Sequence, residues 1–131
     1  MPKILVYSQN LSDIDTVVNP LKEVGYIVSH INDSSELFNV ASDFCADIVI
    51  LSLNDKVDEV SKICRKIRLL DQSSDIQIIL LLENEISFQN ISQGADGYIL
   101  RPINTAVLIS TVNAHLRLKN HLDIFSANRL F

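Results

Sequence analysis

The chain has 131 residues, which is long enough for one domain with a buried core and too short for two ordinary domains. Apolar residues make up 47% of it, which argues against a disordered chain, and no apolar run reaches the ~18 residues of a membrane span. The formal net charge of −5 gives no general attraction to nucleic acid or anionic lipid. The first residues lead directly into an apolar run rather than a secretory signal, so we expect a cytoplasmic protein that contacts no membrane.

Short apolar runs alternate with stretches of helical period along the chain. Three of these runs are nearly all Ile, Val and Leu, which is typical of parallel strands buried on both faces. The runs predict five strands, at 3–8, 26–31, 47–53, 76–82 and 97–101.

The helical stretches lie between these strands. Pro20 falls late in the first of them and should kink or split that helix, because proline lacks an amide donor and clashes with the preceding turn. Asp33 or Ser34 is placed to cap the second helix. The third, over 57–70, has the clearest amphipathic spacing, and the fourth, over 85–93, is short and polar.

Five strands alternating with five helices predict an α/β fold with a parallel sheet, because parallel neighbours require crossover helices of one hand. A flavodoxin-like (βα)5 arrangement, doubly wound with strand order 2-1-3-4-5, suits this number of elements and this length. Sites in such sheets form beyond the carboxyl ends of the strands where the order reverses, here between the first and third strands. The candidate site residues at that edge are Ser8, Gln9, Ser52 and Asn54.

The segment 94–102, Gly-Ala-Asp-Gly-Tyr-Ile-Leu-Arg-Pro, carries a family resemblance. It is similar to the Gly-Ala-Asp-x-Tyr-x-x-Lys-Pro motif of response regulator receiver domains, the CheY-like family. The strand pattern from about Lys3 to about Leu118 matches that family as well. The resemblance implies a module of two-component signal transduction, or phosphorelay, with a cis peptide bond at Arg101–Pro102.

The residues that carry the chemistry of that family are replaced in this chain. The resemblance implies an acidic pair after the first strand and a phosphate-accepting Asp at the end of the third, which together hold Mg²⁺ beside the phosphoryl group. The matching positions hold Ser8, Gln9 and Ser52. Without a carboxylate among them we expect no Mg²⁺ binding and no cofactor. Ser52, with no acid or His predicted beside it, is a weak nucleophile.

Three further matching positions differ from the family or lose their usual role. The family's Ser or Thr at the end of the fourth strand corresponds to about Leu82, which has no hydroxyl. Arg101 replaces a Lys and keeps the charge without the point geometry, so we expect a structural role. Tyr98 matches the switch aromatic and should be a half-buried packing residue or a contact on a partner surface. The resemblance therefore points to a degenerate receiver, or pseudo-receiver, with no catalytic residue and no metal site.

The last helix is predicted to begin at Asn104 or Thr105 and to continue past the end of a plain receiver domain. Its later part carries an apolar stripe at 3-4-3 spacing, which we expect to meet a partner helix or a second copy of the chain. The alternative is a helix whose end frays. The predicted interaction surface consists of His115, Leu118, Leu122 and Phe125. We divide the chain into a receiver-like domain, 1–118, and an extension, 119–131, similar to the linkers that join receivers to diguanylate cyclase domains.

The favoured function is a non-enzymatic signalling module that needs no phosphorylation and acts by protein–protein contact or dimerisation, with nucleic acid not expected as a partner. One alternative is a receiver with a displaced acceptor such as Asp55 or Asp58, although acids at a helix start are commonly capping charges. An alternative of another class is a flavodoxin-like small-molecule or nucleotide-binding protein, but no glycine follows the first strand to wrap a phosphate. Cys45 and Cys64 are expected to be buried or half-buried residues without a redox or metal role.

Overall fold

The computed structural model describes residues 2–52, 57–70, 75–83 and 94–129, and within these ranges it describes all side chains except those of 57–59, 70 and 120–129. These ranges contain a parallel sheet of five strands in the order β2-β1-β3-β4-β5. The strands are β1 (Lys3–Tyr7), β2 (Ile27–Ile31), β3 (Ile48–Ser52), β4 (Gln77–Leu82) and β5 (Gly97–Leu100). The predicted fold class and strand order are confirmed, and each predicted strand end agrees to within one residue.

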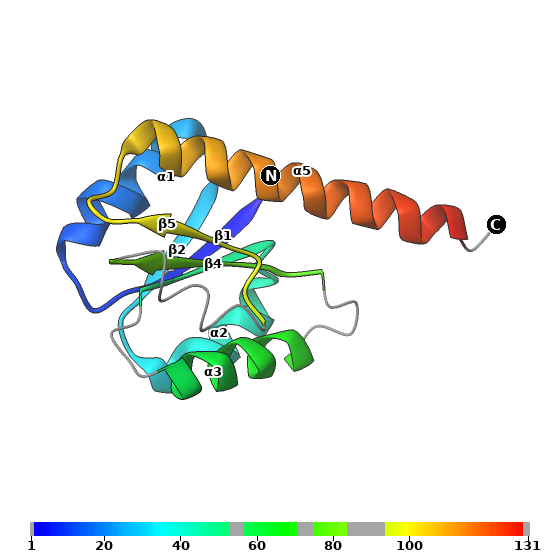
Figure 1. The fold of residues 1–131 in the computed structure, drawn as a ribbon, viewed down its shortest axis with the longest axis horizontal. Coiled ribbons are helices and arrows are strands. Elements are labelled where there is room, and N and C mark those ends of the chain that lie inside the picture. Colours follow the sequence, from blue (N-terminus) through cyan, green and yellow to red (C-terminus); the bar gives the residue numbers. More distant parts are fainter. Residues whose placement is uncertain (1, 53–56, 71–74, 84–93, 130–131) are drawn as a thin grey trace.

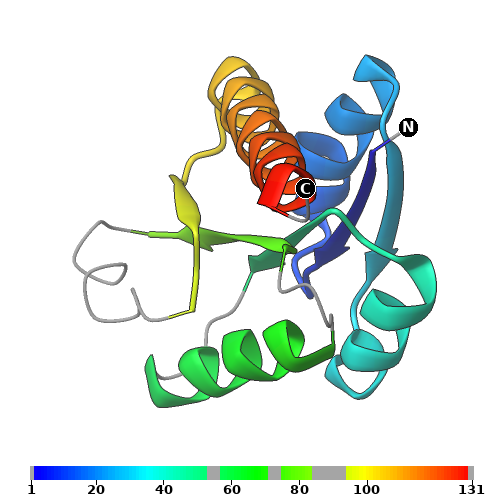
Figure 2. The ribbon, with the colours of Figure 1, turned by 90° about the vertical axis from the view of Figure 1, so that its right-hand side faces the viewer.

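Helices cover both faces of the sheet (Figures 1 and 2). One face carries α1 (Asn19–Val24) and α5 (Thr105–Arg129), and the other carries α2 (Leu37–Phe44) and α3 (Val57–Leu70). The short helix predicted over 85–93 lies outside the described residues. None of the described helices is long and apolar enough to cross a membrane.

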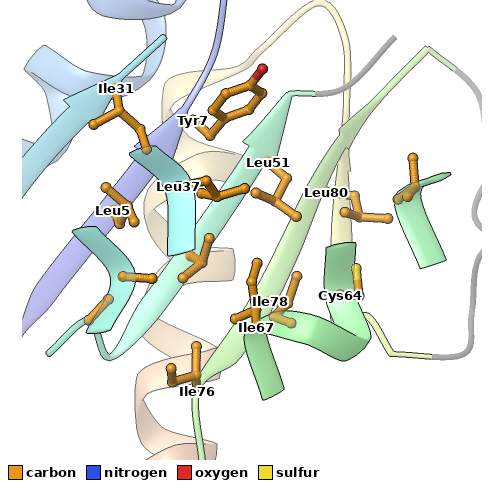
Figure 3. Close-up of a cluster of buried hydrophobic side chains, with 14 of the residues drawn as sticks. Leu5, Tyr7, Ile31, Leu37, Leu51, Cys64, Ile67, Ile76, Ile78 and Leu80 are labelled. Carbon is orange, nitrogen blue, oxygen red and sulfur yellow. The ribbon is translucent and has the colours of Figure 1, made fainter. Parts of the chain in front are cut away.

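The core has two halves, one on each face of the sheet. Successive strand residues point to opposite faces, so β1 contributes Leu5 and Tyr7 to one half and Ile4 and Val6 to the other. The first half lies under α2 and α3, where it includes the thiol of Cys64 (Figure 3). The second half lies under α1 and α5. The sheet is therefore buried on both faces, as its Ile, Val and Leu content indicates.

The first helical stretch changes its winding next to Pro20. A π-helical segment, Ile14–Val18, precedes α1, and the amide of Asn19 donates to the carbonyl of Ile14, five residues back. Pro20 follows as the second residue of α1, where it has no amide to donate to the turn before it. The predicted irregularity at Pro20 is therefore present, as a wide turn just before the proline.

The two ends of α2 show one confirmed and one wrong prediction. Asp33 caps the entry, because its Oδ1 accepts from the amide of Ser35 at 2.9 Å, and a short 3₁₀ turn then leads into α2. Cys45, expected as a buried or half-buried residue, is exposed. It ends α2 in the left-handed conformation with φ of 55°, where the chain turns away from the apolar face.

The last helix begins where the sequence predicts. Asn104 caps α5 by accepting from the amide of Val107 at 3.1 Å, and the preceding Arg101–Pro102 peptide bond is cis. The helix runs through position 118 without a break, so the boundary proposed there stays a prediction. Figure 1 shows the far part of α5 extending past the amino-terminal ends of the strands.

Candidate functional site

Arg101, the residue after β5, reaches across the carboxyl ends of the central strands. Its guanidinium forms a two-pronged ion pair with Asp13, with Nη1 2.8 Å from Oδ1 and Nη2 2.8 Å from Oδ2. Nη2 also donates to the hydroxyl of Ser52, at the end of β3, over 2.7 Å. The crevice between β1 and β3 is therefore bridged by an arginine side chain rather than left open.

Ser8 completes this cluster from the end of β1. It is buried, and its hydroxyl donates to Oδ2 of Asp13 at 2.6 Å. The same hydroxyl oxygen accepts from the amide of Asn10 at 3.0 Å. The carboxylate of Asp13 thus receives three side-chain hydrogen bonds, out of about four that two carboxylate oxygens can accept. We call Ser8, Asp13, Ser52 and Arg101 the crevice cluster.

A tight turn after β1 places Asp13. The amide of Asp13 donates to the carbonyl of Asn10 at 3.0 Å, and the side chain of Asn10 caps the amide of Ser12 at 3.1 Å. Asp13 then stands directly before the π-helical segment, with a side chain that has no exposed surface. A buried aspartate needs compensating partners, and this turn aims it at Arg101 and Ser8.

The electrostatics of the ion pair favour the charged forms of both residues. Burial by itself raises the pKa of Asp13, but the hydrogen bonds from Arg101 and Ser8 and the charge of Arg101 outweigh burial, so this pKa lies below its ordinary value of 3.8. The hydrogen bond to Asp13 raises the pKa of Arg101. At neutral pH the pair is an aspartate facing a guanidinium, in a geometry that favours strong charge-assisted bonds.

Other charges near the crevice contribute less. Glu83, which follows β4, places its Oε1 3.8 Å from Nε of Arg101 but is 76% exposed, so water screens this interaction.

Among the described residues, no group of three or more His, Cys, Asp or Glu side chains is arranged to hold a metal ion.

The structure brings together only part of the predicted site. Ser8, Ser52 and Arg101 meet, whereas Gln9 is exposed and its amide reaches only the carbonyl of Asn32, at 3.4 Å. Leu82, at the end of β4, is buried in the half of the core that lies under α2 and α3. Asn54 and Asp55 lie outside the described residues, as does the side chain of Asp58.

Sequence reasoning missed Asp13, the partner of Arg101. The expectation that no acid lies beside Ser52 is wrong, because Asp13 shares Arg101 with Ser52 and the Ser52 hydroxyl helps to lower its pKa. Arg101 bonds the side chains of Asp13 and Ser52. The signal that could have found Asp13 is the charge of Arg101 itself, because a cation beside a buried crevice requires an acid within reach.

Tyr98 and the predicted interaction surface on the last helix lie outside the crevice cluster. Tyr98 is half-buried and packs against the core under α2 and α3, which fits the packing role expected for it. His115 also packs inside the domain, because its Nδ1 lies 3.0 Å from Oε1 of the buried Gln77. Leu118 is exposed, and the side chains of Leu122 and Phe125 lie outside the described ones.

Comparisons with known proteins place this fold. No family model matches the chain. The DNA-binding dual master transcriptional regulator RpaA of Synechocystis is 27% identical over 121 residues, which cover 89% of this chain. The chain spans 50% of the length of that relative.

Solved structures of receiver domains have the same fold. The receiver-modulated diguanylate cyclase of Pelobacter carbinolicus superposes with a TM-score of 0.76 at 25% identity, covering 94% of this chain and 98% of that one. A two-component response regulator of Clostridium difficile gives a TM-score of 0.76 at 22% identity, over 89% of this chain and 97% of that one.

Proposed function

We propose that this chain, which has the fold of response regulator receiver domains, is a signalling module that acts without phosphorylation, by contact with another protein. The likeness to receivers supports the signalling class. The observation that carries the rest is the crevice cluster, in which Arg101 is bound to Asp13 and Ser52.

A phosphoryl group in this crevice would compete with Asp13 for Arg101. The guanidinium is already neutralised by a carboxylate with no exposed surface. Moving the guanidinium of Arg101 away would leave the carboxylate of Asp13 buried without its cation. Breaking a buried ion pair in this way costs about 3–5 kcal/mol of stability. The cluster therefore opposes the charge that phosphorylation would add.

The cluster also disfavours Mg²⁺ and a serine nucleophile. A divalent cation placed beside Asp13 would meet the fixed positive charge of Arg101 at close range. The hydroxyl of Ser52 would need a base to attack a phosphoryl donor. Asp13 is the acid nearest to it among the described residues, and with a lowered pKa and three hydrogen bonds it is a poor base.

A module without this chemistry must signal through surface contacts. The extended helix α5 supports this reading, because it reaches past the sheet with an exposed Leu118. On this reading the chain has no enzymatic activity, and the last helix is its contact element.

The test combines a phosphoryl donor and a phosphoryl mimic. The chain is incubated with acetyl phosphate and Mg²⁺ for intact-mass measurement, and with beryllofluoride and Mg²⁺ for thermal unfolding, beside a receiver domain that keeps its acceptor Asp. We expect no mass increase and no change in the unfolding temperature, while the control domain shows both.

Two results would replace the proposal. An added phosphoryl group that peptide mapping places on Asp55 or Asp58 would establish a receiver with a displaced acceptor. A bound nucleotide or flavin in the purified protein would favour the small-molecule class instead.

A further inference from the structure

The helix α3 turns one side toward the core and an exposed side toward the outside. The buried residues recur at steps of four and three: Val60, Cys64 and Ile67. The exposed residues opposite them are Lys62, Arg65, Lys66 and Leu69. Each of these four lies three or four positions from two of the others, so together they form one continuous surface on the helix. We call them the α3 patch.

The three cations of the α3 patch have no acid beside them. Within the described part of the chain, neither Lys62, Arg65 nor Lys66 forms an ion pair. Lys62 instead lies one turn from two like charges, which destabilises a helix. The helix dipole favours cations in the last turn, where Arg68 lies, but these three precede it. In a chain of net charge −5, the repulsion within this patch would be relieved by a negatively charged partner.

The α3 patch is also held in place by its surroundings. Arg68, which points away from the patch, forms an ion pair with Asp96 and donates through Nε to the carbonyl of Gly94 at 3.0 Å. These contacts fix the end of α3 against the start of β5. On the other side, Nζ of Lys66 lies 4.4 Å from the ring centroid of Phe38 in α2. A partner would therefore meet a surface that needs little ordering, which favours binding.

Leu69 gives this charged surface an apolar element. It is 85% exposed, more than any other large apolar side chain in the described part of the chain. Arg65 and Lys66 are its neighbours on the preceding turn of α3. A ligand that carries only negative charge would leave Leu69 in water, whereas one that also has an apolar group would bury it. The patch thus combines an apolar contact with positive charge around it.

We infer that the α3 patch binds an acidic segment of another protein, with an apolar residue of that segment on Leu69 and its carboxylates on the surrounding cations. The patch spans ~10 Å along the helix, which suits a short segment. A membrane or a nucleic acid is a larger anionic surface and would also meet the negative charge of the rest of the chain. Figure 2 shows α3 on the face of the sheet opposite α5, so this is a second contact surface beside the one proposed above.

Peptide binding tests the charges of the patch. The probe is a fluorescently labelled peptide of Glu residues with Leu at every fourth position, and its anisotropy is followed at low salt as the protein is added. Lys62→Gln/Arg65→Gln should bind it about tenfold more weakly than the unmodified chain does, the loss expected for two exposed ion pairs. Lys22→Gln/Arg117→Gln is the matched control, because it removes an exposed Lys and an exposed Arg elsewhere and should bind normally.

A second peptide, with Ala in place of Leu, tests the apolar contact. Leu69→Ser should weaken binding of the Leu peptide and leave binding of the Ala peptide unchanged. An equal loss for both peptides would overturn the role of Leu69. No binding by the unmodified chain, or equal binding by the two double variants, would overturn the inference as a whole. So would binding to anionic phospholipid vesicles or to a DNA duplex that depends on the patch in place of peptide binding.

Thermal unfolding separates binding from a structural role. Lys62→Gln/Arg65→Gln should unfold at the same temperature as the control variant or at a higher one, because it removes two like charges. A lower unfolding temperature would assign these cations to stability and overturn the inference. None of these results depends on a phosphoryl donor, so the inference and the proposed function fail separately.

Discussion

Gly97 and His115 lie so close that no other residue fits at position 97 without a shift. A Cβ added to Gly97 would lie 2.5 Å from Nε2 of His115 and 2.9 Å from its Cε1. The ring has little freedom to retreat, because its other nitrogen is bonded to Gln77. The start of β5 and the middle of α5 are therefore held together at this contact.

Replacing Gly97 with Ala should destabilise the domain by about 1–3 kcal/mol, the usual cost of overpacking a well-packed site. Urea unfolding measures the effect. In a double-mutant cycle, Gly97→Ala should cost much less stability in a His115→Ala background, because His115→Ala removes the atoms that clash.

Gly25 provides the comparison for that experiment. A Cβ there meets nothing within 4 Å, but φ is +110°. Gly25→Ala should therefore destabilise through backbone strain, and His115→Ala should leave this loss unchanged. If His115→Ala reduces the loss of stability equally for Gly97→Ala and Gly25→Ala, the contact between Gly97 and His115 does not cause the loss at position 97.

Arg101→Ala should destabilise the chain by about 3–5 kcal/mol, because it leaves the buried Asp13 without its cation. Arg101→Lys should lose less, because it keeps the charge but not the two-pronged geometry. Chemical denaturation of both variants provides the measurement.

The double variant Asp13→Leu/Arg101→Met separates the pair from the packing around it. Replacing both partners of a buried ion pair with apolar residues is often neutral or stabilising. If the double variant is less stable than Arg101→Ala, the stability that Arg101 provides does not come from its ion pair with Asp13.

Stability should fall as the pH drops below about 6.5, and His115 should cause part of this fall. Burial lowers the pKa of His115 below its ordinary value of 6.5, and the charge of Asp96 only partly opposes this. The unfolded chain therefore binds a proton at a higher pH than the folded chain does. The contribution of neutral His115 is complete above about pH 6.5 and is lost as the pH falls toward the folded-state pKa.

Urea unfolding at pH 7.5 and 5.5 isolates this effect when the chain is compared with His115→Gln, which cannot titrate. The variant should lose less stability between the two pH values. An equal loss in both proteins would assign the pH dependence to other groups.

The two cysteines should differ sharply in reactivity. Cys45 is exposed, whereas Cys64 is buried and its thiol pKa is raised to about 11, so little thiolate forms at neutral pH. Iodoacetamide should modify one cysteine in the folded protein and both in urea, and peptide mass mapping identifies them. Equal modification of Cys64 without denaturant would contradict its place in the core.

The strands were predictable because parallel strands buried on both faces are almost continuously apolar, and β1, β3 and β4 each have a polar residue only at one end. The edge that holds the site followed from the strand order alone. Ser8, Ser52 and Arg101 could be assigned to that edge because each adjoins a strand end.

Asp13 could not be found in the same way. It lies in the turn after β1, directly before the π-helical segment, where residues do not follow the 3.6 period that a pattern search assumes. His115 was misjudged because it borders the buried side of α5, and polarity does not reveal which of two neighbouring sides a residue joins. Cys45 appears apolar in a pattern, but the left-handed end of α2 exposes it.

The π-helical segment Ile14–Val18 has a consequence for insertions and deletions in this chain. A π turn holds one residue more than an α turn, so deleting one residue there would give a regular helix at little local cost. The amide of Asn19 and the carbonyl of Ile14, now five residues apart, would become four residues apart and could keep their hydrogen bond. The residues on both sides of the deletion would keep their directions, so Asp13 would still face Arg101, and Val17, Val18 and Leu21 would still face the core. The loss of one codon, such as that of the exposed Asp15, should therefore leave both the crevice and the core in place.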